Sequence, residues 1–361
     1  KKKQTNERHF CWSNMNSRKI FSGLSKQAFF MPSTFRFSSS PFLMETHELK
    51  ELMDAGKKNL VVMNCTKLPD HIKGTKGIAL HEKARIPGSV FFDLAKSVNS
   101  KCRFRMILAD EGEFNEFMKD YPINDNSQIV LYDNFGGTGS SRGYWTLTTY
   151  GVKNVKILNG GFMKWKKDKL PIEKGPMEKK EVTINQPKFR LNPMQLATVS
   201  DVIKVVLGVS AAQLVDVRPE EEYEEHCKDG SWAHIPATKN VYFKDFIAPN
   251  KTWQHVEEIK EALHKGDTWE HRPIITSCLT GMSASIGFVA LKKIGMQDVS
   301  VYDGSWTEYS ELRWDDFRFQ QALEEVPEFA EGVKKLEEEE GWDIKNVTLR
   351  EIMLKLTADI Q

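Results

Sequence analysis

Short apolar runs, rich in β-branched residues, alternate along this chain with longer segments in which apolar positions recur at the helical period. Such runs, bounded by polar and turn residues, predict buried β-strands, and the longer segments predict α-helices. The predicted strands include "NLVVMNC", "SQIVLYD" and "VKILNGG" in the first half, and "AQLVDVR", "PIITSC" and "VSVYDGS" in the second. The predicted helices include "EFNEFMKDYP", "RGYWTLTTYG", "VEEIKEALHKG" and the segment after "PIITSC", which is expected to be amphipathic.

The order of these elements occurs twice. In the first half "ARIPGSVFFDL" leads into a helix, a strand, a glycine-rich turn and a second helix, and "AHIPATKNVYFKDF" begins the same order in the second half. The interval from Asp133 to Gly160 is 27 residues, and that from Cys278 to Gly304 is 26. The sequence therefore predicts an α/β protein with two diverged copies of one domain, each a parallel sheet with helices on both faces.

Shifts in composition divide the chain into segments. The expected segments are a basic N-terminal extension (1–43), a first, non-catalytic domain (44–172), a linker (173–189), a second, catalytic domain (190–317) and an acidic tail (318–361). The linker is rich in Pro, Gly and charge. The tail is expected to be helical and peripheral, and a capping box from Thr348 to Glu351 predicts the start of its last helix.

Composition narrows the classes of partner. Apolar residues make up 40% of the chain and charged residues 28%, which are globular values. A net charge of +1 gives no reason to expect a nucleic-acid or membrane partner. Residues 1–40 carry eight Lys or Arg and one acidic residue, Glu7. The segment "MNSRKIFSGLSKQAFFMPSTFRFSSSPF" contains basic residues but no acidic residue. This composition is typical of a mitochondrial transit peptide or of a disordered basic arm, so the expected location is mitochondrial or cytoplasmic.

The cysteines show no regular framework. They are Cys11, Cys65, Cys102, Cys227 and Cys278. The absence of any CxxC pair argues against a disulfide scaffold and favours a reducing compartment. His226 and His234 flank Cys227, but their spacing matches no standard zinc signature. No metal and no cofactor are therefore expected.

Cys278 has the most suggestive position among these cysteines. A free cysteine is usually a small buried hydrophobe, and that interpretation stays open here. However, Cys278 ends a predicted strand and is followed directly by a tight loop and a helix start. Backbone N–H groups in such a place point at the sulfur and favour the nucleophilic thiolate. The loop expected to form this cradle consists of Leu279, Thr280, Gly281, Met282 and Ser283.

Arg218 and Asp133 complete the prediction for this edge of the sheets. Arg218 ends the first strand of the second copy and is expected on the same rim as Cys278, where it either grips an anionic substrate or pairs with Asp216 or a nearby glutamate. Asp133 occupies the Cys278 position in the first copy. Its loop, "DNFGGTGSSR", is expected to be too long for the same compact cradle, so the first copy is interpreted as a non-catalytic partner.

Several motifs together resemble a known family. The paired "RIPG" and "HIPA", the "DVR" stretch, the loop "CLTGMSA" and "VYDGSW" resemble the two-domain rhodanese-like sulfurtransferases, across about residues 45–315. The resemblance implies that Cys278 takes sulfane sulfur from 3-mercaptopyruvate or thiosulfate as a persulfide. It also implies transfer of that sulfur to cyanide or to a thiol acceptor, such as a small dithiol or a thioredoxin-like protein. In that family Arg218 matches a substrate-binding arginine, and Leu279 to Ser283 match the cradle.

The sequence also departs from the family pattern. The loop reads CLTGMS, whereas the resemblance predicts CRKGVT for thiosulfate enzymes or CGSGVT for mercaptopyruvate enzymes. Glu222 stands where the family has a second arginine, and Ala95 and Arg105 stand where mercaptopyruvate enzymes carry an acid and a histidine. Thr280 is the best local proton donor. Because of these departures, an alternative function stays open: the chain is a persulfide carrier or a low-activity binding module of the rhodanese family. A cysteine phosphatase is disfavoured because Ala284 stands where that chemistry needs arginine.

Overall fold

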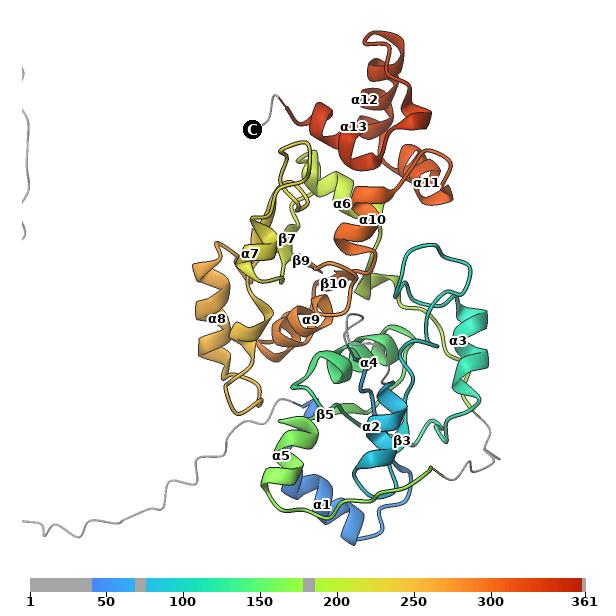
Figure 1. Cartoon of the computed structure of the whole chain (residues 1–361), viewed down its shortest axis with the longest axis vertical. Helices are drawn as coiled ribbons and strands as arrows, with labels where there is room; N and C mark the ends of the chain where they lie inside the picture. Colours follow the sequence, from blue (N-terminus) through green and yellow to red (C-terminus); the bar gives the residue numbers. More distant parts are fainter. Residues whose placement is uncertain (1–40, 69–75, 178–185, 359–361) are drawn as a thin grey trace, which may run out of the picture. The chain divides into compact units, whose positions relative to one another are not determined.

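A parallel sheet of five strands lies in each half of the chain (Figure 1). The computed structural model describes residues 41–68, 76–177 and 186–358. The transit-peptide prediction therefore lies almost entirely outside the described residues. The last residues of the predicted extension are an exception, because Leu43 already belongs to the first strand. In the described ranges no helix combines the length and the apolar character needed to cross a membrane.

The two sheets have equivalent strand orders, β1-β5-β4-β2-β3 and β6-β10-β9-β7-β8. The strands of the first sheet are β1 (Leu43–Met44), β2 (Leu60–Asn64), β3 (Val90–Phe91), β4 (Gln128–Tyr132) and β5 (Val155–Leu158). Those of the second sheet are β6 (Leu196–Ala197), β7 (Gln213–Asp216), β8 (Thr238–Asn240), β9 (Ile274–Ser277) and β10 (Val299–Tyr302). Neighbouring strands run parallel in both sheets, so the predicted repeat of one α/β domain is confirmed.

Helices cover both faces of each sheet. The helices of the first half are α1 (Thr46–Asp54), α2 (Gly77–Lys83), α3 (Glu111–Met118), α4 (Thr138–Thr149) and α5 (Gly161–Lys167). The second half has α6 (Val199–Val206), α7 (Glu220–Tyr223), α8 (Val256–Lys265), α9 (Ala284–Lys293) and α10 (Ser305–Glu311), with short 3₁₀ turns at Pro193–Gln195 and Phe243–Phe246. In Figure 1, α6 and α10 lie on one face of the second sheet, and α8 and α9 lie on the other.

The alternation of side chains along the strands explains the two-sided cores. In β2 and β4, Met63 and Leu131 belong to a core that also contains residues of α3 and α4. Val62 and Val130 point the opposite way and pack with residues of α1 and α5. Successive side chains of a strand point to opposite faces, so a run of consecutive apolar residues fits a sheet that is covered on both sides.

Helix α9 differs from its prediction. It was expected to be amphipathic, but all side chains from Ala284 to Leu291 are buried. The reason is that α9 packs against β9 and β10 on one side and against α4 on the other. One apolar core therefore runs continuously from the first sheet to the second within the compact unit formed by residues 39–361.

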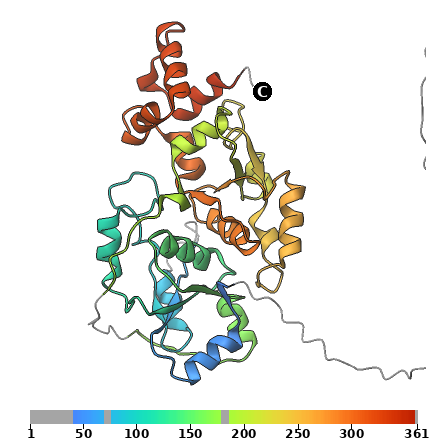
Figure 2. The same ribbon diagram turned by 180° about the vertical axis from the view of Figure 1, so that it is seen from behind.

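The acidic tail also differs from its prediction. It is helical, as α11 (Phe317–Glu325), α12 (Pro327–Glu338) and α13 (Leu349–Leu356), and the predicted capping box of Thr348 and Glu351 is present. However, the tail is not peripheral. The tail helices carry a stripe of buried apolar side chains, which consists of Phe319, Ala322, Val326, Phe329, Val333 and Leu336. This apolar stripe shares a core with α6 and α10. The tail helices lie beside α6 and α10 in both views (Figures 1 and 2).

Candidate active site

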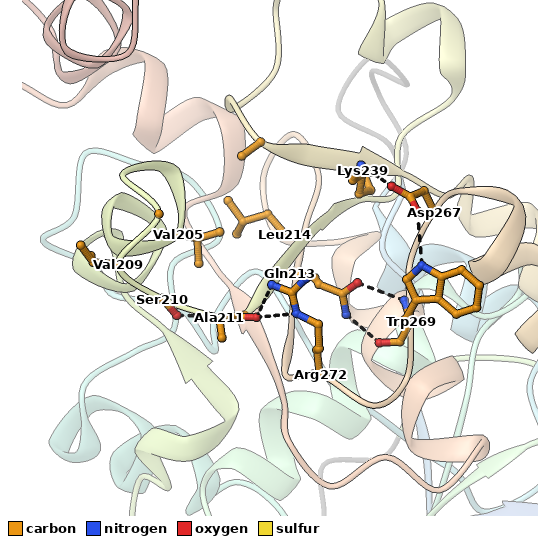
Figure 3. Close-up of a pocket in the computed structure, with 13 residues that line it drawn as sticks. Val205, Val209, Ser210, Ala211, Gln213, Leu214, Lys239, Asp267, Trp269 and Arg272 are labelled. Carbon is orange, nitrogen blue, oxygen red and sulfur yellow. Dashed lines mark hydrogen bonds and ion pairs between the residues drawn. The ribbon is translucent and has the colours of Figure 1, made fainter. Parts of the chain in front are cut away.

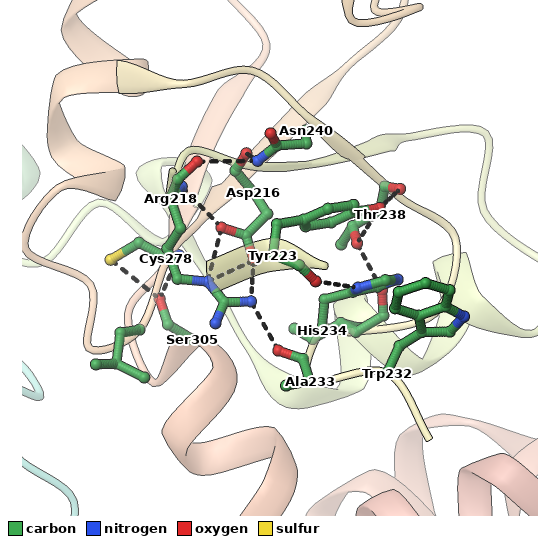
Figure 4. Close-up of polar contacts among 12 residues, drawn as sticks. Asp216, Arg218, Tyr223, Trp232, Ala233, His234, Thr238, Asn240, Cys278 and Ser305 are labelled. Atoms are coloured by element: carbon green, nitrogen blue, oxygen red, sulfur yellow. Dashed lines mark hydrogen bonds and ion pairs between the residues drawn. The ribbon is translucent and has the colours of Figure 1, made fainter. Parts of the chain in front are cut away.

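Cys278 follows the last residue of β9 and lies at the carboxyl edge of the second sheet. Its side chain is buried, with 1% of its surface exposed. The Cys278 N–H donates to Ser305 Oγ at 3.1 Å. The same hydroxyl donates to the Tyr302 carbonyl at 2.9 Å and lies 3.9 Å from Cys278 Sγ (Figure 4). Cys278 is therefore held at its backbone while a hydroxyl group stands beside its sulfur.

Ser305 was missed by the sequence analysis. Its φ of +52° lies in the left-handed region, which a residue with a Cβ rarely adopts. Gly161, the equivalent residue in the first copy, has nearly the same φ of +53°. The copy with a cysteine thus carries a strained serine where the copy without one has glycine. The signal in the sequence was the second-copy motif "VYDGSW" against "VKILNGG" in the first copy, and strain of this kind is typical of functional positions.

The loop from Leu279 to Ser283 connects Cys278 to α9. Within the described residues, no hydrogen bond is recorded from the backbone N–H groups of this loop. The Leu279 carbonyl is fixed by the Thr307 N–H at 3.1 Å and the Thr307 hydroxyl at 2.8 Å. Gly281 has a φ of +77°, and a Cβ there would lie 2.4 Å from the Asp303 carbonyl oxygen. The loop is thus a tight turn with unused N–H donors at the start of a helix, an arrangement suited to an anion.

Arg218 lies at the same edge of the sheet as Cys278. Strands β7 and β9 are parallel neighbours, and Asp216 pairs in register with Ser277, so the residues after them meet at one rim. The Arg218 guanidinium makes the structural ion pair that the sequence left open, with Nη2 2.7 Å from Asp216 Oδ2. Nη2 also donates to the Ala233 carbonyl at 2.9 Å (Figure 4). Nη1 has no recorded partner in the described part of the chain, and the Arg218 side chain as a whole is 5% exposed.

An aromatic stack lies beside Arg218, and the sequence analysis did not predict it. The rings of Tyr223 and His234 are stacked with centroids 4.0 Å apart, and Trp232 and His226 follow with centroids 4.1 Å apart. Burial lowers the pKa of His234, which favours its neutral form. His234 thus stacks on Tyr223, and His226 lies tilted against Trp232. No group of three or more metal-ligating side chains occurs in the described ranges. Trp232 is 48% exposed and gives this rim an apolar surface.

The other predicted site residues lie farther toward solvent. Thr280 is half-buried, and Glu222 is exposed on α7, four residues after Arg218. Ala95 is exposed, with its N–H bonded to Asp93, and Arg105 is exposed as well. The residues that replace the acid and the histidine of the family pattern are therefore surface residues of the first copy.

The expectation for the first-copy loop was wrong. Helix α4 begins five residues after Asp133, whereas α9 begins six residues after Cys278, so the first-copy loop is not the longer one. It is a compact loop whose backbone N–H groups bind the side chain of Asp133. The buried Asp133 carboxylate accepts hydrogen bonds from the N–H groups of Phe135 at 2.8 Å, Gly137 at 3.1 Å and Ser140 at 2.8 Å. The first copy therefore carries a hydrogen-bonded carboxyl group where the second copy carries a thiol.

We expect Asp133→Asn to lower folding stability but to leave turnover within a few-fold, because Asp133 holds its own loop and lies outside the second-copy site. The amide would direct an NH₂ group or a single weaker acceptor at the donors of the loop, which costs about 1–3 kcal/mol. Urea unfolding and steady-state kinetics measure the two effects, with the exposed Asp125→Asn as the matched control. A large loss of turnover with unchanged unfolding would place Asp133 in the reaction.

A cavity lined by residues of the second sheet lies away from Cys278. It has a volume of about 730 Å³ and is open to solvent (Figure 3). Gln213 starts β7 and Arg272 precedes β9, so this cavity lies at the amino edge of the second sheet, opposite the edge of Cys278. Its charged groups are already engaged, with Lys239 paired to Asp267 at 2.5 Å and Arg272 bonded to the Ala211 carbonyl at 2.6 Å. It is therefore not the cysteine site.

The fold is thus a tandem repeat of one α/β domain. The second copy carries Cys278 at the end of its strand β9, and the first copy carries the Asp133 carboxylate, bound by its own loop, at the end of β4. The rhodanese-like domain family matches residues 45–168 and 203–312. This chain belongs to the rhodanese-like family. A probable 3-mercaptopyruvate sulfurtransferase of Schizosaccharomyces pombe is 31% identical over 74% of this chain and 92% of its own length.

Further relatives carry related names. A 3-mercaptopyruvate sulfurtransferase of Escherichia coli is 30% identical over 62% of this chain and 79% of its own length. A thiosulfate sulfurtransferase of Mus musculus is 28% identical over 63% of this chain and 78% of its own length. Among solved structures, SseA of Escherichia coli matches with a TM-score of 0.66 and 24% identity, covering 73% of this chain and 98% of SseA. Tum1 of Saccharomyces cerevisiae matches with a TM-score of 0.65 and 23% identity, covering 74% of this chain and 93% of Tum1. The structural likeness shows the fold.

Proposed function

We propose that this sulfurtransferase moves sulfane sulfur from 3-mercaptopyruvate or thiosulfate to a thiol or cyanide, through a persulfide on Cys278. One observation carries the proposal. In the first copy the N–H groups of the loop after the strand bind the Asp133 carboxylate, and in the second copy the N–H groups of the loop after Cys278 have no recorded acceptor among the described residues. Backbone N–H groups beside a cysteine can stabilise the negative charge of a persulfide formed on its sulfur.

The reaction with mercaptopyruvate proceeds in two balanced steps. The Cys278 thiolate attacks the donor sulfur, a new S–S bond forms, and the C–S bond breaks. The electron pair of that bond leaves as the enolate of pyruvate, which then takes a proton at carbon. In the second step an acceptor thiolate attacks the outer sulfur of the persulfide and releases the Cys278 thiolate again. The protein must therefore stabilise negative charge at sulfur twice and supply one proton.

The residues around Cys278 can take specific parts in this reaction. The Ser305 hydroxyl, 3.9 Å from Sγ, can donate to the thiolate or to the persulfide if its proton turns away from the Tyr302 carbonyl. Nη1 of Arg218 can hold a carboxylate or a thiosulfate oxygen, because its other nitrogen atoms are fixed by Asp216 and Ala233. The half-buried Thr280, in the loop after Cys278, is a candidate to deliver the proton to the enolate, either directly or through water. Because Cys278 is deeply buried, small donors are favoured.

We expect mercaptopyruvate to be the better donor by kcat/KM, but with a high KM. The uncharged loop CLTGMS disfavours doubly charged thiosulfate, and Glu222 removes one cationic partner for the carboxylate. One charge-assisted hydrogen bond is worth about 1.5–3 kcal/mol, or roughly tenfold to a hundredfold in affinity. Glu222→Arg should therefore lower the KM for mercaptopyruvate by about that factor and change thiosulfate use less.

Glu221→Arg is the matched control for this experiment, because it makes the same charge change in the same exposed helix. Steady-state assays of all three proteins with each donor, against cyanide and a dithiol, give the comparison. Preference of the unmodified protein for thiosulfate, or equal effects of the two arginine variants, would contradict the assignment of the donor.

The departures at Glu222, Ala95 and Arg105 support a second candidate, a persulfide carrier with little turnover. A carrier would form the persulfide in a single turnover and pass it on only to a specific protein thiol. An enzyme would turn over many equivalents of donor with a small dithiol. The same assays, run at limiting and at excess donor, separate the two candidates.

A further inference from the structure

The first copy reaches into the cysteine loop of the second copy through one buried arginine. Arg142 lies in α4 and is 1% exposed. Its Nη1 donates to the Gly281 carbonyl at 3.1 Å and to Asp303 Oδ1 at 2.6 Å. Its Nη2 donates to the Met106 carbonyl, and its guanidinium lies 4.5 Å from the centre of the Trp145 ring. Arg142 is thus fixed on several sides while it binds the backbone of the loop that follows Cys278.

The bond to Gly281 constrains one peptide plane of the cradle. In a trans peptide the carbonyl and the following N–H point in opposite directions. Because the Gly281 carbonyl points at Arg142, the Met282 N–H points away from Arg142. The first copy shows the use of an N–H at the same distance from the strand end along the chain: the N–H of Gly137, four residues after Asp133, donates to the Asp133 carboxylate. Met282 is likewise four residues after Cys278.

We propose that Arg142 is a positioning residue for the Cys278 loop, and that its bond to the Gly281 carbonyl holds the Met282 N–H toward the cysteine sulfur. The inference rests on the proposed persulfide function and adds a role for the first copy. That copy carries no nucleophile, but it orients an N–H donor that stabilises the anionic sulfur. Arg142 does not touch the donor, so its loss changes kcat rather than KM.

Asp303 explains why the position requires an arginine. Its carboxylate is held by Arg142 and by the Leu108 N–H at 2.6 Å, and it lines the wall against which Gly281 turns. Burial raises the pKa of Asp303, and the Arg142 charge opposes that shift. A lysine would keep the charge that Asp303 needs. It would lack the planar fork that reaches Gly281, Asp303 and Met106 together.

Arg142→Lys tests the proposal. We expect kcat to fall by about tenfold to a hundredfold, with KM within about threefold, because one oriented donor to the sulfur anion is lost. We also expect alkylation of Cys278 by iodoacetamide at pH 7, followed by mass spectrometry of its peptide, to slow by a similar factor. The matched control is Arg85→Lys. Arg85 is also a buried arginine of the first copy, ion-paired to Glu173 and bonded to the Gly175 carbonyl at 2.6 Å.

The control should lose thermal stability to a similar extent while keeping kcat and the alkylation rate. If Arg142→Lys fails to fold, the double variant Arg142→Met with Asp303→Asn removes both charges together and should show the same loss of rate. A folded variant at Arg142 with unchanged kcat and alkylation would overturn the proposal, as would an equal loss in Arg85→Lys. Alkylation needs no sulfur donor. If the unmodified protein transfers no sulfur but Arg142→Lys still slows alkylation, the proposed reaction fails and the positioning role stands.

Discussion

Replacing Cys278 by serine should abolish sulfur transfer from either donor, with turnover falling by at least about a thousandfold, the scale for loss of an enzyme nucleophile. Serine nearly preserves the volume of the buried side chain and its place against Ser305, so the fold should survive. The unmodified protein, treated with donor and freed of excess reagent, should gain about 32 Da per sulfur. Cys278→Ser should gain nothing in the same mass measurement.

Two other cysteines provide the controls for this result. Cys65 is fully buried, and burial together with nearby Asp133 raises its pKa well above the ordinary value, so its thiol is a poor nucleophile. Cys227 is half-buried in the loop with the aromatic stack and is the more accessible competitor. Cys65→Ser and Cys227→Ser should each keep the mass gain and the turnover. Uptake of sulfur by Cys278→Ser would move the acceptor to another cysteine and refute the site.

The two copies show how one fold supports two different roles. Each has a strand that ends in a short loop and a helix start. In the first copy the carboxylate of Asp133 satisfies the loop and closes it. In the second copy the loop amides have no recorded acceptor among the described residues, and the sulfur of Cys278 lies at the start of that loop. The aspartate and the cysteine at the strand ends are thus the main chemical difference between the structural loop and the candidate catalytic loop, together with Ser305 in place of Gly161.

Much of the fold could be predicted because local pattern and tertiary structure agree. Six of the ten strands, β2, β4, β5, β7, β9 and β10, were found from their apolar runs, since a parallel sheet covered on both faces buries consecutive residues. The position of Cys278 relative to Arg218 followed from the parallel pairing of β7 and β9. The repeat added the comparison with Asp133, which no single segment would have provided.

The remainder depends on contacts between distant residues, which a single sequence does not show. Arg142 is one of several polar residues in "RGYWTLTTYG", and only the packing of α4 on α9 reveals that it is buried. Ser305 is distinguished by its backbone conformation, not by its residue type. In the tail, the count of acids concealed an apolar stripe at helical spacing. The residues of that stripe are Phe319, Ala322, Val326, Phe329, Val333 and Leu336.

This stripe leads to the second large expected effect, a loss of stability in Phe329→Ala. The Phe329 ring is fully buried and meets the ring of Phe319 edge to face, with centroids 5.5 Å apart. Truncation of a buried phenylalanine to alanine costs about 3–5 kcal/mol, because the apolar contact is lost and a cavity remains. We expect that loss in the free energy of unfolding of the second domain, measured by urea titration with tryptophan fluorescence.

Phe317→Ala is the matched control, because the Phe317 side chain is 70% exposed at the start of α11 and its removal should cost less than about 0.5 kcal/mol. A peripheral tail would unfold by itself, so that Phe329→Ala would leave the main unfolding transition unchanged. A tail that shares the core of α6 and α10 must instead shift that transition. The outcome decides whether the C-terminal helices are part of the folded unit that holds the cysteine loop.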